Sequence, residues 1–152
     1  PKTIKVIDLT KDKPAFKADT EKMRRVFVNI IRNAFDAMPE GGTLTVKSRK
    51  VKDKLEISFE DTGAGMSQET LSKLKGDFPL FTTKAKGMGF GVPICKRIVE
   101  AHGGKLSVES KIGKGTKITI AVPIKPKPSN ESKPELIFNE SVLQTTAKQK
   151  MK

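Results

Sequence analysis

The stretch NIIRNAFDAMPEGG, residues 29–42, decides how the rest of this chain is interpreted. Apolar residues recur in it and just before it at steps of three and four, which predicts an amphipathic helix over 22–38. The closing PEGG ends that helix. Asn29 and Asn33 are four positions apart and share one face of the helix. Asparagine is a poor helix former, so this pair either satisfies nearby backbone groups or directs amide oxygens into a cleft.

Outward from this helix, short runs of alternating apolar and polar residues predict strands. Asp19 is expected to cap the long helix, and Ser67 a short one over 67–75. A second long helix is expected over 92–102, with Pro93 in its first turn. The strands are expected at 3–9, 44–46, 55–59, 106–108 and 118–122. A sheet with one wet face and one helix-covered face forms an α/β (α+β) two-layer sandwich.

The composition is that of a soluble domain. The chain has 152 residues, enough for one domain with a core, and 36% of them are hydrophobic and 31% charged. No apolar run is long enough for a membrane helix, and we expect no signal peptide. Because the chain begins at Pro1, we expect a piece of a longer protein. The formal net charge of +13 favours polyanions such as ATP. A nucleic-acid-binding module is an alternative, although Trp and Tyr are absent for base stacking.

Two glycine-rich motifs follow the asparagine helix. DTGAG at 61–65 leaves a strand end, where the Asp61 carboxylate can accept a hydrogen bond from an exocyclic amine and favour adenine over guanine. Gly63 and Gly65 let the backbone approach a flat ring, although a plain turn has the same pattern. GMGFG at 87–91 precedes the second long helix, whose N-terminus favours phosphate. Its three glycines predict an irregular segment, either a phosphate-binding loop or an ordinary surface loop.

Other kinds of site are disfavoured. The chain has no GxxxxGK[ST] motif, and GMGFG lacks the GxGxxG spacing, so neither a Walker loop nor a Rossmann site is indicated. The single cysteine, Cys95, lies on the apolar side of a helical pattern and is expected in the core. The single histidine, His102, lies at a helix C-terminus without a thiol or metal-ligand partner in the sequence. Nucleophilic catalysis and a zinc site are therefore not expected.

Together these motifs resemble the catalytic ATP-binding domain of sensor histidine kinases, within the superfamily shared with gyrase, the Hsp90 chaperone and MutL. Five ordered boxes carry the resemblance over about residues 3–124: NIIRNAFDAMPEGG, DTGAGM, FPLFTTK, GMGFG and IVEAHGGKLSVESKIGKGTKITIAVP. The resemblance implies the Bergerat ATP-binding fold, a mixed, mostly antiparallel sheet covered on one face by helices. We expect this domain over 1–124 and a Pro-, Lys- and Ser-rich tail over 125–152, either disordered or with a short helix.

The resemblance also implies roles for individual residues. Asn33 matches the asparagine that coordinates magnesium, and Asn29 matches its partner one turn earlier. Asp61 matches the aspartate that binds the adenine amino group, and Thr116 lies near the base. The other implied nucleotide-binding positions are Gly63, Gly65 and Met66 beside the ring, Phe81, Thr82, Thr83 and Lys84 at the opening of the ATP lid, Gly87, Met88, Gly89, Phe90, Gly91 and Val92 around the phosphates, and Gly113 and Gly115 in the last box.

Departures from the family pattern refine the expected chemistry. In the hydrolytic branches a glutamate stands where this chain has Asn29, and it acts as general base for water. An amide cannot act as a base, so Asn29 favours phosphoryl transfer over ATP hydrolysis. Asp36 stands where many histidine kinases have a basic residue, which makes Lys84 the candidate phosphate contact. His102 does not lie in the motif of the phosphoacceptor histidine, so the acceptor is expected on another domain.

The expected function is therefore to bind Mg-ATP and to donate the γ-phosphoryl group to a histidine on a separate dimerisation domain, leaving ADP, as in two-component signalling. The expected partners are that domain of the parent protein and a downstream response regulator, with no specific nucleic acid. We expect this chain to be monomeric and its parent a homodimer. The expected location is the cytoplasm, with the parent either soluble or membrane-anchored. An anti-sigma-type serine kinase and an ATP-gated gyrase- or chaperone-type module are the alternatives.

Overall fold

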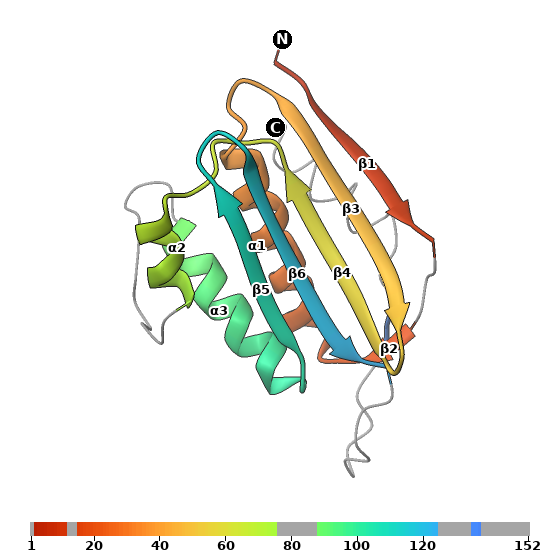
Figure 1. Ribbon diagram of the computed structural model, residues 1–152. Helices are drawn as coiled ribbons and strands as arrows, with labels where there is room; N and C mark the ends of the chain where they lie inside the picture. Colours follow the sequence, from red (N-terminus) through yellow and green to blue (C-terminus); the bar gives the residue numbers. More distant parts are fainter. Residues whose placement is uncertain (1, 12–14, 76–87, 125–134, 138–152) are drawn as a thin grey trace.

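The computed structural model describes residues 2–11, 15–75, 88–124 and 135–137 (Figure 1). Its elements in chain order are β1 (Ile4–Thr10), β2 (Ala15–Lys17), α1 (Thr20–Asp36), β3 (Gly42–Val51), β4 (Lys54–Asp61), α2 (Gln68–Lys75), α3 (Met88–Ala101), β5 (Lys105–Lys111), β6 (Gly115–Pro123) and β7 (Glu135–Ile137). None of these helices is long and apolar enough to cross a bilayer.

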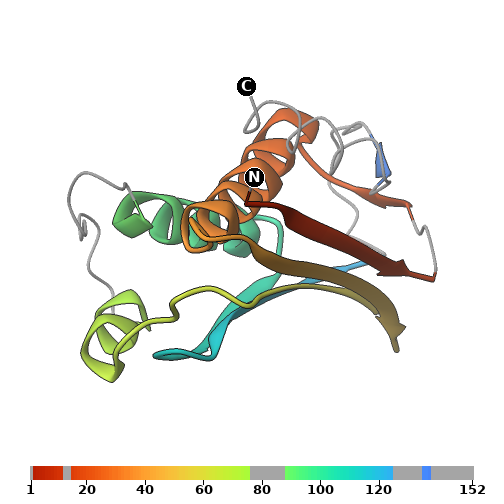
Figure 2. The same ribbon diagram turned by 90° about the horizontal axis from the view of Figure 1, so that it is seen from above.

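Five strands form one mixed sheet in the order β1-β3-β4-β6-β5. Only β1 and β3 pair in parallel, and the other three pairings are antiparallel. Figure 2 shows α1 and α3 side by side over one face of this sheet. The expected two-layer sandwich with a mostly antiparallel sheet is therefore confirmed.

The core lies between the sheet and these two helices. Alternate residues of β3, β4 and β6 face the helices, as the period of two requires, and they are almost fully buried. From α1, residues at steps of three and four enter the same core. Phe27 of α1 packs on Phe59 of β4, with ring centroids 6.0 Å apart. The largest fully buried side chains are Phe27, Phe59, Met23, Ile30, Ile31, Leu44, Leu55, Ile57, Ile120, Val26, Val46 and Val99. Each contributes roughly 1.5–3 kcal/mol by leaving water.

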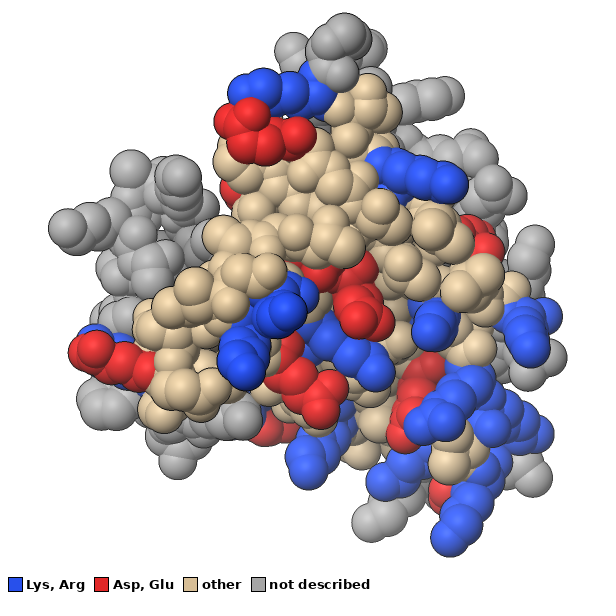
Figure 3. Space-filling view, turned by 45° about the horizontal axis from the view of Figure 1, so that its top comes forward, with Lys and Arg blue, Asp and Glu red and all other residues tan. Residues whose placement is uncertain are grey.

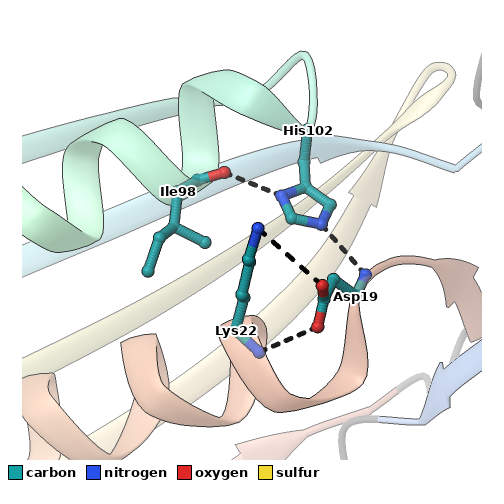
Figure 4. A network of polar contacts seen from close by, with 4 residues as sticks. All are labelled: Asp19, Lys22, Ile98 and His102. Atoms are coloured by element: carbon teal, nitrogen blue, oxygen red, sulfur yellow. Dashed lines mark hydrogen bonds and ion pairs between the residues drawn. The ribbon is translucent and has the colours of Figure 1, made fainter.

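A polar network joins the start of α1 to the end of α3 (Figure 4). Asp19 caps α1 as expected, since its carboxylate accepts a hydrogen bond from the Lys22 amide at 3.1 Å. The backbone N–H of Asp19 donates to Nε2 of His102 at 3.0 Å, and Nδ1 of His102 lies 2.7 Å from the Ile98 carbonyl oxygen. Both bonds form together only in the neutral tautomer with the proton on Nδ1. His102 therefore links the start of α1 to the end of α3 by hydrogen bonds, and the two helices run antiparallel.

The structure corrects the expectation for the second glycine motif. The motif was expected to be irregular and the helix to start at Val92, yet α3 begins at Met88 and includes Gly89 and Gly91. Pro93 accordingly lies inside α3, beyond its first turn. The first four N–H groups of any helix lack intrahelical acceptors, so a proline this early removes only one of the first intrahelical hydrogen bonds.

Two short strands were not expected from the sequence. β2 pairs with β7 in antiparallel fashion, with Phe16 opposite Leu136. Phe16 is 2% exposed and belongs to the core. The segment 135–137 of the tail is therefore strand rather than helix, and it lies against the segment that leads into α1.

The solvent face of the sheet carries charges of both signs. Glu60 and Glu109 are the register partners of Lys117, and Arg49 forms an ion pair with Glu56 at 2.8 Å. Basic side chains gather instead at the turn between β3 and β4, in the lower right of Figure 3. The exposed lysines of this turn region are Lys50, Lys52 and Lys54. This basic turn lies at the end of β4 opposite to Asp61.

Candidate nucleotide-binding site

A row of polar side chains crosses the sheet at the other end of β4. Asp61 on β4 is the register partner of Thr116 on β6, and Thr116 is the partner of Ser110 on β5. The three residues share the helix-facing side of the sheet because paired residues point the same way. Asp61 is 6% exposed and Thr116 9% exposed. An otherwise apolar layer therefore ends in a buried polar row.

The Asp61 carboxylate is held by backbone donors. Its Oδ1 accepts hydrogen bonds from the N–H of Gly63 at 2.9 Å and of Thr116 at 3.2 Å. Burial nevertheless raises the pKa of Asp61, as does the nearby Glu60 charge to a smaller extent, against the lowering effect of these two backbone bonds. Both bonds end on Oδ1, which leaves Oδ2 for a donor on a ligand.

Ser110 links the loop after β4 to the hairpin of β5 and β6. Its hydroxyl oxygen accepts a hydrogen bond from the Met66 N–H at 2.8 Å and lies 2.9 Å from the Gly115 carbonyl oxygen and 2.8 Å from Thr116 Oγ1. Ser110 is not among the site residues predicted from the sequence. A signal was present, because Ser110 continues the inward-facing alternation of Leu106 and Val108 with a polar side chain.

Glycines allow the close packing around this row. Gly115 has φ +89°, and a Cβ there would overlap the Asp61 carbonyl oxygen. Gly65 has φ +72°, and a Cβ there would overlap the Lys111 carbonyl oxygen. Positive φ and the lack of space both require glycine at these two positions. The loop 62–66 and the β5–β6 turn are also joined by a hydrogen bond from the Gly113 N–H to the Ala64 carbonyl at 2.8 Å.

The two asparagines of α1 have different surroundings. Asn33 lines a small cavity of about 20 Å³ together with Asp61, Met66 and Thr116. Asn29 is absent from that lining and lies one turn away, and the Cys95 thiol of α3 is 3.7 Å from the Val26 carbonyl oxygen. Burial raises the pKa of the Cys95 thiol to about 12, so the thiol stays protonated at neutral pH and is not nucleophilic.

Gly91 lets α3 approach the asparagine face of α1. A Cβ at Gly91 would lie 3.2 Å from Nδ2 of Asn33 and 3.7 Å from Cβ of Asn29. Val92 lines the cavity beside Asn33. Of the other expected positions, Met88, Gly89 and Phe90 form the start of α3, whereas Phe81, Thr82, Thr83, Lys84 and Gly87 lie outside the described residues.

The structure thus brings Asn33, Asp61, Met66 and Thr116 to one cavity. A volume of about 20 Å³ holds about one water molecule and is smaller than a purine. Figure 1 places this end of the sheet at the top, beside the end of α1. A larger open hollow of about 1200 Å³ follows the solvent face and the β5 edge, but Val92 is the one expected site residue in its lining.

A magnesium site built from protein carboxylates is not present in the part of the chain that the structure describes, where no three His, Cys, Asp or Glu side chains gather. Asn33 lines the cavity, and its side chain carries a single amide oxygen. This donor set fits Mg²⁺ that arrives with a nucleotide, because Mg²⁺ retains several waters and is often bound through substrate phosphates.

Comparisons with known proteins agree with this geometry. The family model "Histidine kinase-, DNA gyrase B-, and HSP90-like ATPase" matches residues 18–126. Sporulation kinase C of Bacillus subtilis is 42% identical over 107 residues, which are 70% of this chain and 24% of that protein. The adaptive-response sensory kinase SasA of Synechococcus elongatus is 33% identical over 122 residues, 78% of this chain and 32% of that protein.

Solved structures show the same similarity. The nucleotide-free catalytic domain of histidine kinase ThkA has a TM-score of 0.71 and 29% identity, over 81% of this chain and 82% of that one. The mycobacterial sensor histidine kinase MprB has a TM-score of 0.68 and 26% identity, over 82% and 84% of the two chains. The present chain spans between 16% and 24% of the length of the three sporulation kinases C, E and D.

The family model covers well over half of the chain, including α1, the Asp61 loop, α3 and the β5–β6 hairpin. It also includes every residue of the polar row and the cavity described above. This chain therefore belongs to the family of histidine kinase-, DNA gyrase B- and HSP90-like ATPases, and its fold is that of the histidine kinase catalytic domains.

Proposed function

We propose that this chain binds Mg-ATP at the Asp61 end of the sheet and donates the γ-phosphoryl group to a histidine on a separate dimerisation domain. The observation that carries the proposal is the buried Asp61 carboxylate, whose Oδ1 is occupied by two backbone donors. Its Oδ2 suits the exocyclic amino group of adenine, and the Asn33 amide oxygen suits the metal that accompanies the phosphates.

Phosphoryl transfer is favoured over hydrolysis because no carboxylate occupies position 29. The side chain at this position is the amide of Asn29, and an amide has no basic lone pair to activate water. Catalysis of phosphoryl transfer relies mainly on positioning and charge neutralisation. Mg²⁺ would supply the charge neutralisation. This chain would hold the adenine ring through Asp61 and the metal ion through Asn33.

The partners of the parent protein are part of the proposal. ThkA has been solved in complex with the response regulator protein TrrA, and its chain in that complex is 27% identical to this one. The sensor kinases among the relatives support a place in two-component signalling. We propose that the phosphoryl group passes from ATP to the acceptor histidine and then to a response regulator.

A transfer experiment tests the proposed function. The 152-residue chain is mixed with γ-labelled ATP, Mg²⁺ and a separately produced hairpin that carries the parent's acceptor histidine. We expect label on the hairpin that is labile in acid and stable in base, as for phosphohistidine. Label that is stable in acid and labile in base would identify a serine acceptor, and release of inorganic phosphate alone would identify an ATPase. A hairpin with its histidine replaced by alanine is the control.

A further inference from the structure

We propose that Ser110 is a positioning residue that fixes the direction of the Thr116 hydroxyl group, so that the pocket presents hydrogen-bond acceptors, and no hydroxyl donor, to position 6 of a bound purine. The inference rests on the proposed nucleotide site. It assigns to Ser110 a part in the choice between adenine and 6-oxo purines, although Ser110 itself is not in the lining of the cavity.

Three polar atoms lie within hydrogen-bond distance of the Ser110 hydroxyl oxygen. They are the Met66 nitrogen at 2.8 Å, the Gly115 carbonyl oxygen at 2.9 Å and Thr116 Oγ1 at 2.8 Å. They belong to the loop after β4 and to the first two residues of β6. One hydroxyl group therefore holds together the two segments that frame the Asp61 carboxylate.

The directions of these hydrogen bonds follow from the inventory of donors and acceptors. A serine hydroxyl has one hydrogen and two lone pairs. The Met66 N–H can only donate and the Gly115 carbonyl can only accept, so Ser110 accepts from the first and donates to the second. Its single hydrogen is then used, and the contact with Thr116 requires the Thr116 hydroxyl to donate. The reverse direction would leave the Gly115 oxygen facing a lone pair of Ser110.

Thr116 consequently has only lone pairs to offer a ligand. It lines the cavity beside Asp61, whose Oδ1 is occupied by the N–H groups of Gly63 and Thr116. The polar row thus offers Asp61 Oδ2 and Thr116 Oγ1 as two neighbouring acceptors, to a ligand directly or through one bridging water. Adenine has an amino donor at position 6, whereas hypoxanthine and guanine have a carbonyl acceptor there, which would meet like polarity.

The test compares ATP with ITP, which differ at position 6 by an amino group and a carbonyl. Both dissociation constants are measured calorimetrically for the wild-type chain and for Ser110→Ala. Loss of the Ser110 oxygen lets the Thr116 hydroxyl turn and donate to O6 of ITP. We expect the ratio of ITP affinity to ATP affinity to rise by about tenfold, the size of one net hydrogen bond.

Matched variants show whether a change in the ratio of affinities comes from the direction of the Thr116 hydroxyl group or from a loss of stability. Ser107→Ala removes an exposed hydroxyl from the same strand on the solvent face, and it should leave the ratio unchanged. Ser110→Thr keeps a hydroxyl and should restore the wild-type ratio. Thr116→Val should weaken ATP binding without any gain for ITP. If Ser110→Ala does not fold, Ser110→Cys fills the same space with a weak hydrogen-bonding group and should shift the ratio in the same direction.

The outcomes are distinguishable. A Ser110→Ala chain that loses ATP and ITP affinity equally, with an unchanged ratio, overturns the inference and leaves the proposed function intact. An unchanged ratio in Ser110→Cys overturns it as well. A wild-type chain that binds no ATP would refute the proposed function and this inference together.

Discussion

At the scale of single residues, Asp61 shows a conflict between stability and function. Burial raises its pKa, which means that the surroundings disfavour the charged form. The two backbone donors on Oδ1 offset only part of that cost. A neutral amide of the same shape could accept the same two hydrogen bonds without carrying a charge. The carboxylate therefore lowers the stability of the unliganded domain, which is the behaviour expected of a group that binds a hydrogen-bond donor of a ligand.

The variant Asp61→Asn separates the two effects. Its affinity for ATP should fall by about 10- to 100-fold, since a hydrogen bond to a charged group contributes roughly 1.5–3 kcal/mol. The pKa of Asp61 is raised in the folded state, so the unfolded chain releases this proton first as pH rises above the ordinary value of 3.8. The contribution of Asp61 to the free energy of unfolding therefore falls as pH rises from there through the raised pKa. The unliganded variant should accordingly gain stability relative to wild type between pH 4 and pH 7.

Calorimetric ATP titrations and urea unfolding at the two pH values measure these changes. Glu109→Gln removes the same charge from the solvent face and should change neither quantity appreciably. Unchanged ATP affinity in Asp61→Asn would show that the nucleotide binds elsewhere.

At the scale of elements, the antiparallel pair of α1 and α3 determines where the site can form. His102 fastens the start of α1 to the end of α3, and Gly91 brings the other end of α3 close to Asn33. Cys95 lies between these ends, with its thiol near the Val26 carbonyl oxygen at 3.7 Å. One end of the pair is thus held by a polar link and the other contributes to the cavity.

Replacing His102 by alanine should lower the free energy of unfolding by about 1–3 kcal/mol, because the partly buried Asp19 N–H loses its acceptor. ATP affinity should change little, since Asp19 and Asn33 are about 21 Å apart along α1 at ~1.5 Å per residue. Urea unfolding and ATP titration measure the two effects. Lys22→Ala changes only an exposed ion pair of the same network and should cost under about 0.5 kcal/mol. Equal losses in both variants would refute the special role of His102.

The sequence predicts those elements whose residues follow a strong period. α1 has a regular apolar stripe and a capping aspartate, and its predicted limits, 22 and 38, lie within two residues of the observed ones. The predicted start of α3 is wrong because glycines such as Gly89 and Gly91 disfavour a helix locally. The close approach of Gly91 to Asn33 favours the helix in the folded protein. β2 and β7 have three residues each, too few to establish a period, and their pairing joins segments far apart in the chain.

The candidate site was predictable to the extent that single motifs define it. Asn33, Asp61, Met66 and Thr116 were named from the sequence and meet at one cavity. Ser110 was missed because its role depends on the register of β5 against β6. The different surroundings of Asn29 and Asn33 were also missed, since helical spacing places both on one face but does not say which neighbour each one meets.

At the scale of the whole molecule, charge is the main imbalance. The net charge is +13, and the ion pairs among the described residues involve largely exposed side chains. Such pairs contribute roughly 0–1 kcal/mol each. We therefore expect repulsion among the surplus lysines to outweigh these ion pairs, most of all around the basic turn between β3 and β4.

Salt should then act in opposite directions on folding and on binding. Raising NaCl from 20 to 300 mM should increase the free energy of unfolding by about 1 kcal/mol, because screening weakens the self-repulsion. ATP affinity should fall over the same range, because the attraction of a polyanion is screened too. Urea unfolding and ATP titration at several salt concentrations test this.

The triple variant Lys50→Gln, Lys52→Gln, Lys54→Gln lowers the net charge from +13 to +10 and should show a smaller stabilisation by salt. A wild-type chain that becomes less stable as salt increases would show that the ion pairs, and not the surplus charge, dominate.

The polar row of Asp61, Thr116 and Ser110 also bears on how the molecule folds. Its three members come from three strands and meet only when β4, β6 and β5 are paired in the observed register. A slip of one residue in β6 would turn Thr116 to the solvent face. Pairing of strands that are distant in sequence slows folding, so we expect the ability to bind nucleotide to arise late in folding. By mass action, a bound nucleotide then stabilises the correct strand register over slipped alternatives, and amide exchange in all three strands should slow together when ATP is present.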